Sequence, residues 1–226
     1  KYGADALRFY LMSTPLMKAQ DINFNEKVLS DLNRKFNVIL TNVFTFYSLY
    51  GKTNTSFSYF TSAHILDRWI MSKLHLLIRN VTTSFEAYDT VSACTEFLTF
   101  IDLLSTWYVR RSRDRFKDGD EDVVKTLGSV LMHLIQLMSP LTPFISEDIY
   151  QQFRKVKPSL LESVHLELWP HFDATLIDDQ LNKDMDLVRE LVSLALEKRE
   201  QAKISIRQVL PQLILTGVQL TKPFLE

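Results

Sequence analysis

The segment FLTFIDLLSTWYVRRSRDRFK, Phe97–Lys117, joins an apolar run to a dense group of positive charges. At about 100° per residue, its apolar side chains fall on one face of a helix, and Arg111 and Arg115 continue that face. Arg110 and Arg113 point to another side. The segment therefore predicts a helix that faces a core for most of its length and ends in arginine. The predicted apolar face consists of Phe97, Phe100, Ile101, Leu104, Trp107 and Tyr108.

The positive charges at the end of this helix admit two interpretations. In the first, Arg111 and Arg115 pair with carboxylates of a neighbouring helix, such as Glu147 or Asp148, and cations near a helix C-terminus also interact favourably with the helix dipole. In the second, the helix end projects beyond the core and the planar arginine heads meet phosphate. Composition alone leaves both open. We call these residues the basic cluster: Arg110, Arg111, Arg113, Arg115 and Lys117.

The aromatic pair Trp107–Tyr108 beside the basic cluster also has two interpretations. Aromatic rings stack on unpaired bases in RNA sites. Both residues, however, continue the apolar stripe of the helix. The periodicity therefore favours a place in the core, and Trp107 is kept as a candidate RNA contact beside the basic cluster.

The rest of the chain repeats this helical pattern. Apolar residues at steps of three and four predict further helices, and polar capping residues or proline mark their ends. Long helices with short connections predict an antiparallel bundle. The predicted helices begin after Gly3, at Asn25, near His64, at Asp89, at Asp120, after Thr142 and near Leu181, and Thr142-Pro143 supplies an N-cap followed by a proline at the first helical position.

The pattern changes after the bundle. Residues 157–179 are irregular, and SVHLELWP is expected to cross the bundle as extended chain. The run VLPQLILTG, Val209–Gly217, is short, continuously apolar and closed by glycine, which is typical of a strand. The predicted fold class is therefore all-α, an antiparallel helical bundle with a short C-terminal α/β extension.

Composition and the absence of known motifs exclude several classes of function. The 226 residues carry a formal net charge of -1, which excludes a globally basic nucleic-acid binder but leaves room for a local basic patch. The one cysteine, Cys94, excludes an internal disulfide framework and suits a reducing compartment. We find no glycine-rich phosphate loop, no HExxH and no CxxC motif, so we expect no catalytic residues and no metal site. No run is long and apolar enough to span a bilayer.

Several segments together resemble one family, the class Ia aminoacyl-tRNA synthetases. They match its segments in the same order along the chain: KYGADALRFYLM, DINFNEK, SPLTPFISEDIYQQF, ESVHLELWP and IRQVLPQLIL. WYVRRSRDRF resembles the isoleucyl branch, whereas DINFNEK suits a valyl member equally well. The HIGH and KMSKS signatures of the family are absent from these 226 residues.

The resemblance implies a fragment of an isoleucyl enzyme that binds the anticodon arm of its tRNA. It implies a connector from the catalytic domain at residues 1–24, the anticodon-binding bundle at 25–156, and a further region at 157–226. We expect no cofactor in this fragment, whereas the whole enzyme would use ATP and Mg²⁺. The expected partner is isoleucine tRNA, with no membrane, and the expected state is a cytoplasmic monomer. The alternatives are a valyl fragment and a non-catalytic helical scaffold whose arginines are structural.

Overall fold

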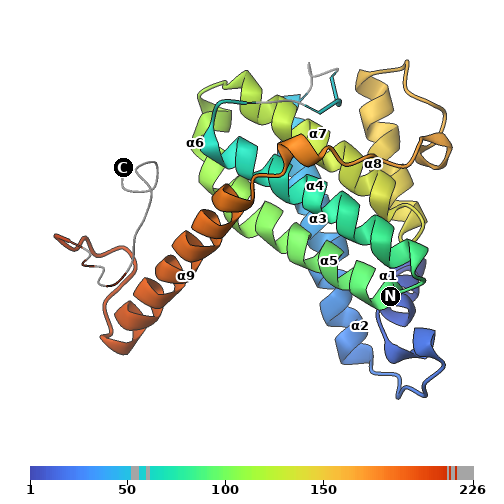
Figure 1. The fold of residues 1–226 in the computed structure, drawn as a ribbon, viewed down its shortest axis with the longest axis horizontal. Coiled ribbons are helices and arrows are strands. Elements are labelled where there is room, and N and C mark those ends of the chain that lie inside the picture. Colours follow the sequence, from blue (N-terminus) through green and yellow to red (C-terminus); the bar gives the residue numbers. More distant parts are fainter. Residues whose placement is uncertain (52–55, 60–61, 213, 215–216, 218–226) are drawn as a thin grey trace. The chain divides into compact units, whose positions relative to one another are not determined.

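The computed structural model describes residues 1–51, 56–59, 62–212, 214 and 217, and every regular element among them is helical. The predicted all-α bundle is confirmed. The chain divides into two compact units, Lys1–Ile177 and Asp178–Glu226, whose helices are drawn in Figure 1.

The first unit contains the bundle. Short turns join consecutive helices, so that neighbours such as α4 and α5 run antiparallel, and α4 packs along both α5 and α7 (Figure 1). The principal helices of this unit are α1 (Ala4–Met12), α2 (Glu26–Asn33), α3 (Ile39–Tyr50), α4 (Ile65–Glu86), α5 (Thr90–Asp102), α6 (Arg110–Lys117), α7 (Glu121–Met138) and α8 (Pro143–Val156). Its 3₁₀ turns are η1 (Pro15–Lys18), η5 (Val164–Leu166) and η6 (Ala174–Leu176).

Two π-helical segments each join two consecutive α-helices into one long helix. The segment η2 (Arg34–Val38) joins α2 to α3, and η4 (Leu103–Val109) joins α5 to α6. The predicted single helices from Asn25 and from Asp89 are therefore confirmed in extent. A π turn takes one residue more than an α turn, so each segment shifts the faces of the helix that follows it.

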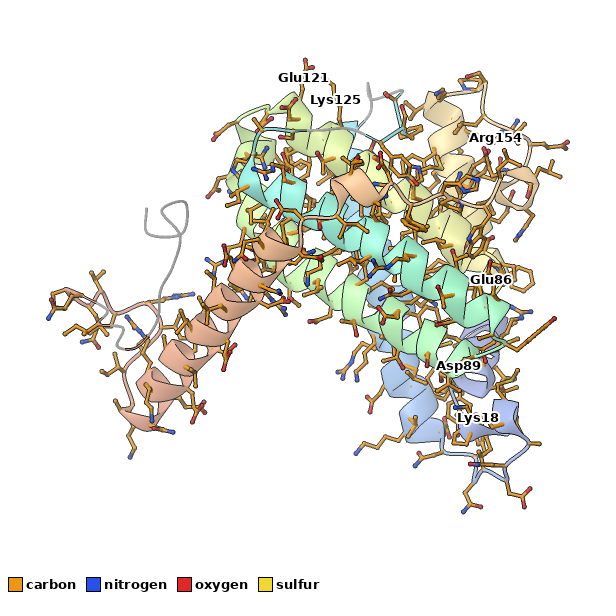
Figure 2. All side chains as sticks on the ribbon, viewed as in Figure 1. Lys18, Glu86, Asp89, Glu121, Lys125 and Arg154 are labelled. Atoms are coloured by element: carbon orange, nitrogen blue, oxygen red, sulfur yellow. The ribbon has the colours of Figure 1, made fainter. Side chains whose placement is uncertain are left out.

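Capping side chains fix the helix starts. The predicted caps at Asn25, Asp89 and Asp120 are confirmed, because each side chain accepts a hydrogen bond from an amide in the first turn. Figure 2 shows Asp89 at the turn between α4 and α5. At α8, Thr142 holds the N-cap position, but its hydroxyl donates to the carbonyl of Met138 at 3.2 Å.

A residue distant in sequence completes that last cap. The Asp5 side chain on α1 accepts a hydrogen bond from the amide of Ile145 at 2.8 Å. Asp5 is buried and also pairs with Arg8 at 2.8 Å. The carboxylate therefore joins α1 to the start of α8.

The core surrounds α4, which packs against both α5 and α7. Its largest fully buried side chains come from α1, α4, α5, α6, α8 and the two π segments: Trp69, Tyr108, Tyr150, Phe9, Phe36, Phe97 and Phe116. In the part of the chain that the structure describes, no helix combines the length and the apolar character that a membrane crossing needs.

The segment after α8 is tied to α4 by hydrogen bonds. The Trp169 Nε1 group donates to Thr82 Oγ1 at 2.9 Å, and the Asp173 amide donates to His75 Nδ1 at 3.0 Å. Thr82 and His75 both belong to α4, whereas η5 at the start of the segment packs on α7 and α8. The segment therefore passes from α7 and α8 to α4.

The second unit contains α9 (Asp179–Gln201), which begins with a hydrogen bond from the Leu181 amide to the Asp178 side chain at 2.9 Å. This confirms the predicted last helix. The run VLPQLILTG lies partly outside the described residues, and residues 209–212 within it form no strand.

Candidate nucleic-acid interface

The basic cluster divides into an exposed group and one inward-facing arginine. Arg110, Arg111, Arg113 and Lys117 are exposed, whereas the Arg115 side chain keeps only 17% of its accessible surface. The end of the helix therefore presents several cations to solvent and turns one into the protein.

The π-helical segment η4 explains this division. The sequence pattern placed Trp107 and Arg111 on the buried face. Trp107 is half-buried, but Arg111 is exposed, so the placement of Arg111 is wrong. Because η4 takes an extra residue, the buried face continues through later positions. Those buried positions are Tyr108, Val109, Ser112 and Phe116.

Arg115 holds two carboxylates with its whole head group. Its Nη1 and Nη2 atoms lie 2.8 and 2.7 Å from Oδ1 and Oδ2 of Asp67, and its Nε lies 2.8 Å from Oδ2 of Asp120. Asp67 belongs to the first turn of α4, and Asp120 caps α7. Arg115 therefore joins the end of α6 to the starts of two other helices.

The carboxylates suggested by the sequence are not the partners of Arg115. Glu147 accepts hydrogen bonds from Gln151, Ser163 and the Val164 amide, which stabilise the segment after α8. Asp148 accepts from Gln152 at 3.3 Å. The structural interpretation therefore applies to Arg115 but with different partners.

Electrostatics around Arg115 favour its charged form. Burial opposes the charge, but Asp67 and Asp120 outweigh burial and raise the pKa of Arg115. For Asp120, partial burial is outweighed by hydrogen bonds from Arg115 and backbone amides, which lower its pKa. Tyr108 is fully buried and donates to Asp67 at 2.8 Å, and burial together with this carboxylate raises the pKa of its hydroxyl. The network therefore holds one cation between two carboxylates, with one neutral phenol beside them.

The exposed arginines have no such partners. Within the described ranges, no carboxylate forms an ion pair with Arg110, Arg111 or Arg113. Lys117 pairs with Asp114 at 3.0 Å, and both side chains are mostly exposed. Surface pairs of this kind contribute little free energy, so Lys117 can exchange its partner readily.

Trp107 supports one of the exposed arginines. The guanidinium carbon of Arg111 lies 4.9 Å from the centre of a Trp107 ring, within the range of a cation–π contact. The half-buried indole thus has Arg111 on its outer side. The structure brings these two candidate residues together and separates them from Arg115.

Asp67 is the residue of this network that the sequence did not identify. Asp67 lies three residues before Ile70 and four before Met71, so it shares a helix face with these apolar residues. A lone carboxylate on an apolar face is a signal for a buried partner, because an unpaired buried charge is costly. The sequence pattern does not identify the cation that pairs with this carboxylate.

The described residues include no cluster of three or more histidine, cysteine, aspartate or glutamate side chains suited to a metal ion. His64 Nδ1 accepts from the Leu66 amide at 3.2 Å at the start of α4. The chemistry of this surface is that of hydrogen-bond donors and positive charge.

Comparison with known proteins identifies one matching family and several similar proteins that share one name. Residues 67–214 match the family described as the anticodon-binding domain of tRNA ligase. The chain is 36% identical over 226 residues to isoleucine–tRNA ligase of Clostridium novyi, which covers 95% of this chain and 22% of that protein. The Cutibacterium acnes enzyme of the same name is 44% identical over 163 residues, or 72% of this chain and 15% of that protein.

A solved structure has a similar fold. A LeuRS of Agrobacterium radiobacter K84, in a ternary complex with tRNA and LeuAMS, aligns with a TM-score of 0.61 and 21% identity, covering 78% of this chain and 20% of that one. At this identity the likeness concerns the fold alone. The chain spans about a fifth of the length of the curated relatives that it matches most fully.

Proposed function

The chain belongs to the family of anticodon-binding domains of tRNA ligases, and on this premise we propose that its basic cluster contacts the anticodon arm of isoleucine tRNA. The relatives described above are isoleucine–tRNA ligases, which favours the isoleucyl over the valyl alternative. Membership of this family also disfavours a purely structural scaffold.

One observation carries the proposal. Arg110, Arg111 and Arg113 are exposed on one helical turn and form no ion pair in the described part of a chain whose net charge is only -1. Three unpaired cations on adjacent positions repel one another, and an RNA backbone would relieve that repulsion. Arginine is suited to this because its planar head donates two hydrogen bonds to a phosphate.

The two other cations of the cluster play different parts in the proposal. Lys117 adds a charge at the C-terminal end of α6, where its surface pair with Asp114 is easily exchanged for a phosphate. Arg115 fixes the helix end through Asp67 and Asp120, so that the exposed arginines keep their direction. Trp107 holds the Arg111 head group through the cation–π contact.

We propose that the chain acts within a longer ligase that joins isoleucine to its tRNA with ATP and Mg²⁺. Those cofactors would bind in the remainder of the ligase, because this surface offers cations and an aromatic ring rather than metal ligands. We further propose a cytoplasmic monomer. Cys94 is a buried free thiol, which suits a reducing compartment.

RNA fragments test the proposed function directly. Fluorescence anisotropy would measure binding of the 226-residue chain to whole isoleucine tRNA, to its isolated anticodon-arm hairpin and to an acceptor-stem minihelix without that arm. We expect the chain to bind the tRNA and the hairpin and to bind the minihelix much more weakly. Equal affinity for hairpin and minihelix would contradict the proposal, because the contact would then be non-specific phosphate attraction.

A further inference from the structure

The contact between Trp107 and Arg111 distinguishes Arg111 from the other exposed arginines. Its guanidinium carbon lies 4.9 Å from the centre of a Trp107 ring. Arg111 is exposed and Trp107 is half-buried, so the indole is held by the protein while the arginine head lies toward solvent. No comparable aromatic support is present under Arg110 or Arg113 in the described ranges.

The helix geometry makes this pairing. Residues four apart are neighbours on a helix surface, which brings Arg111 over Trp107. Because η4 turns Arg111 off the buried face, its head meets the indole instead of the core or a carboxylate. The Arg111 side chain thus has a preferred position, and its hydrogen-bond donors are not engaged by an acidic partner.

We propose that Trp107 and Arg111 form a stacking site for one unpaired nucleobase of the RNA. The inference rests on the proposed function and adds to it which arginine meets a base and which meet phosphates. Flat guanidinium heads and aromatic rings are the groups on which splayed-out RNA bases stack. Arg110 and Arg113, on the same helix, supply the charge that holds the adjoining backbone.

A matched pair of substitutions separates stacking from charge. Arg111→Lys keeps the positive charge but removes the planar head, and Arg113→Lys makes the same change at an exposed arginine without a ring beneath it. Binding of each 226-residue chain to the anticodon-arm hairpin is measured over a salt series. The hairpin is also made with each loop base removed in turn, leaving the sugar and phosphate.

We expect Arg111→Lys to weaken binding about tenfold, the scale of one lost base stack, with an unchanged salt slope because the charge remains. Arg113→Lys should weaken binding by a clearly smaller factor, because a phosphate contact keeps its charge and loses only the second hydrogen bond of the planar head. Removal of one particular loop base should weaken hairpin binding by the unsubstituted chain by a similar factor to that of Arg111→Lys. With that abasic hairpin, the unsubstituted chain and Arg111→Lys should bind equally well.

Two results would overturn the stacking site, and they differ. In the first, the unsubstituted chain binds the hairpin, and Arg111→Lys either binds it equally well or shows the same loss of affinity with every abasic hairpin. The contact with Trp107 is then surface packing, and the proposed function stands. If the unsubstituted chain does not bind the hairpin at all, the proposed function is overturned together with the stacking site.

Discussion

Arg115 and Asp67 form a bidentate ion pair, with Nη1 2.8 Å from Oδ1 and Nη2 2.7 Å from Oδ2. Asp67 is completely buried, and the Arg115 side chain keeps 17% of its surface. Taking one partner from a buried pair leaves an uncompensated charge, which costs about 3–5 kcal/mol. The pair therefore fixes α6 against the start of α4, and the exposed arginines depend on it for their place.

Removing the charge of Asp67 should destabilise the whole bundle. Asp67→Asn keeps the size of the side chain, and we expect the free energy of unfolding to fall by about 3 kcal/mol. Urea unfolding followed by circular dichroism measures this. The control is Asp114→Asn at the exposed pair with Lys117, which should change stability by less than about 0.5 kcal/mol. Similar small losses in both variants would show that the buried pair does not hold these helices together.

Asp5 should stabilise a helix more than a hundred residues away in the sequence. Asp5→Ala removes the acceptor of the Ile145 amide at the start of α8, and loss of a cap typically costs about 1 kcal/mol. We expect faster hydrogen exchange at the Ile145 amide together with this loss of stability.

Asp31→Ala serves as the control for the Asp5 cap, because Asp31 has only an exposed 3.5 Å pair with Arg34. Its expected effect on the exchange of Ile145 is nil. Unchanged exchange of Ile145 in Asp5→Ala would mean that Thr142 or solvent satisfies this end of α8.

Stability should fall in mild acid because of His75. This ring is buried, accepts from the Asp173 amide at 3.0 Å and packs against Tyr59, which in turn stacks on His133. Burial, and next the charge that His133 can take up, lower the pKa of His75 to about 4, while Asp173 opposes them. The unfolded chain takes up this proton near pH 6.5, so between about pH 6.5 and 4 it binds more protons than the folded chain. Stability is therefore lost as pH falls through this window, by up to about 3 kcal/mol.

His75→Asn tests this assignment, since its side-chain oxygen can still accept from the Asp173 amide but does not titrate. Urea unfolding at several pH values should give a flatter dependence between pH 6.5 and 4 for the variant, whatever its stability at pH 7. Some dependence should remain, because burial also lowers the pKa of His133. Identical slopes for the two proteins would show that His75 is not the group that titrates.

Local features of the fold could be predicted from the sequence. The caps at Asn25, Asp89 and Asp120 act within one turn of their own helices, so neighbouring residues were enough to identify them. The apolar stripes likewise gave the extent of each long helix. These signals depend on the chain within a few residues of each position.

Features that depend on distant contacts could not be predicted. The partners Arg115 and Asp67 are 48 residues apart, and Asp5 is 140 residues from Ile145. The π segment η4 has no local signature, and by shifting the buried face it moved Arg111 outward and left Trp107 at the edge of the core. A regular helical period therefore gave the right helix with the wrong face at its end.

The salt dependence of tRNA binding tests the central claim most directly. Affinity for isoleucine tRNA is measured over a salt series for the 226-residue chain and for Arg110→Gln, Arg113→Gln and Arg115→Gln, with Arg34→Gln as the control. Arg34 is also exposed, but it begins η2 between α2 and α3 and is not part of α6.

Each phosphate contact releases counterions, so Arg110→Gln and Arg113→Gln should each reduce the log–log slope by about 0.7 to 0.9. Arg34→Gln should leave the slope unchanged, and Arg115→Gln should chiefly lower the free energy of unfolding. Unchanged slopes for Arg110→Gln and Arg113→Gln, at full affinity, would contradict the claim that the exposed end of this helix binds RNA.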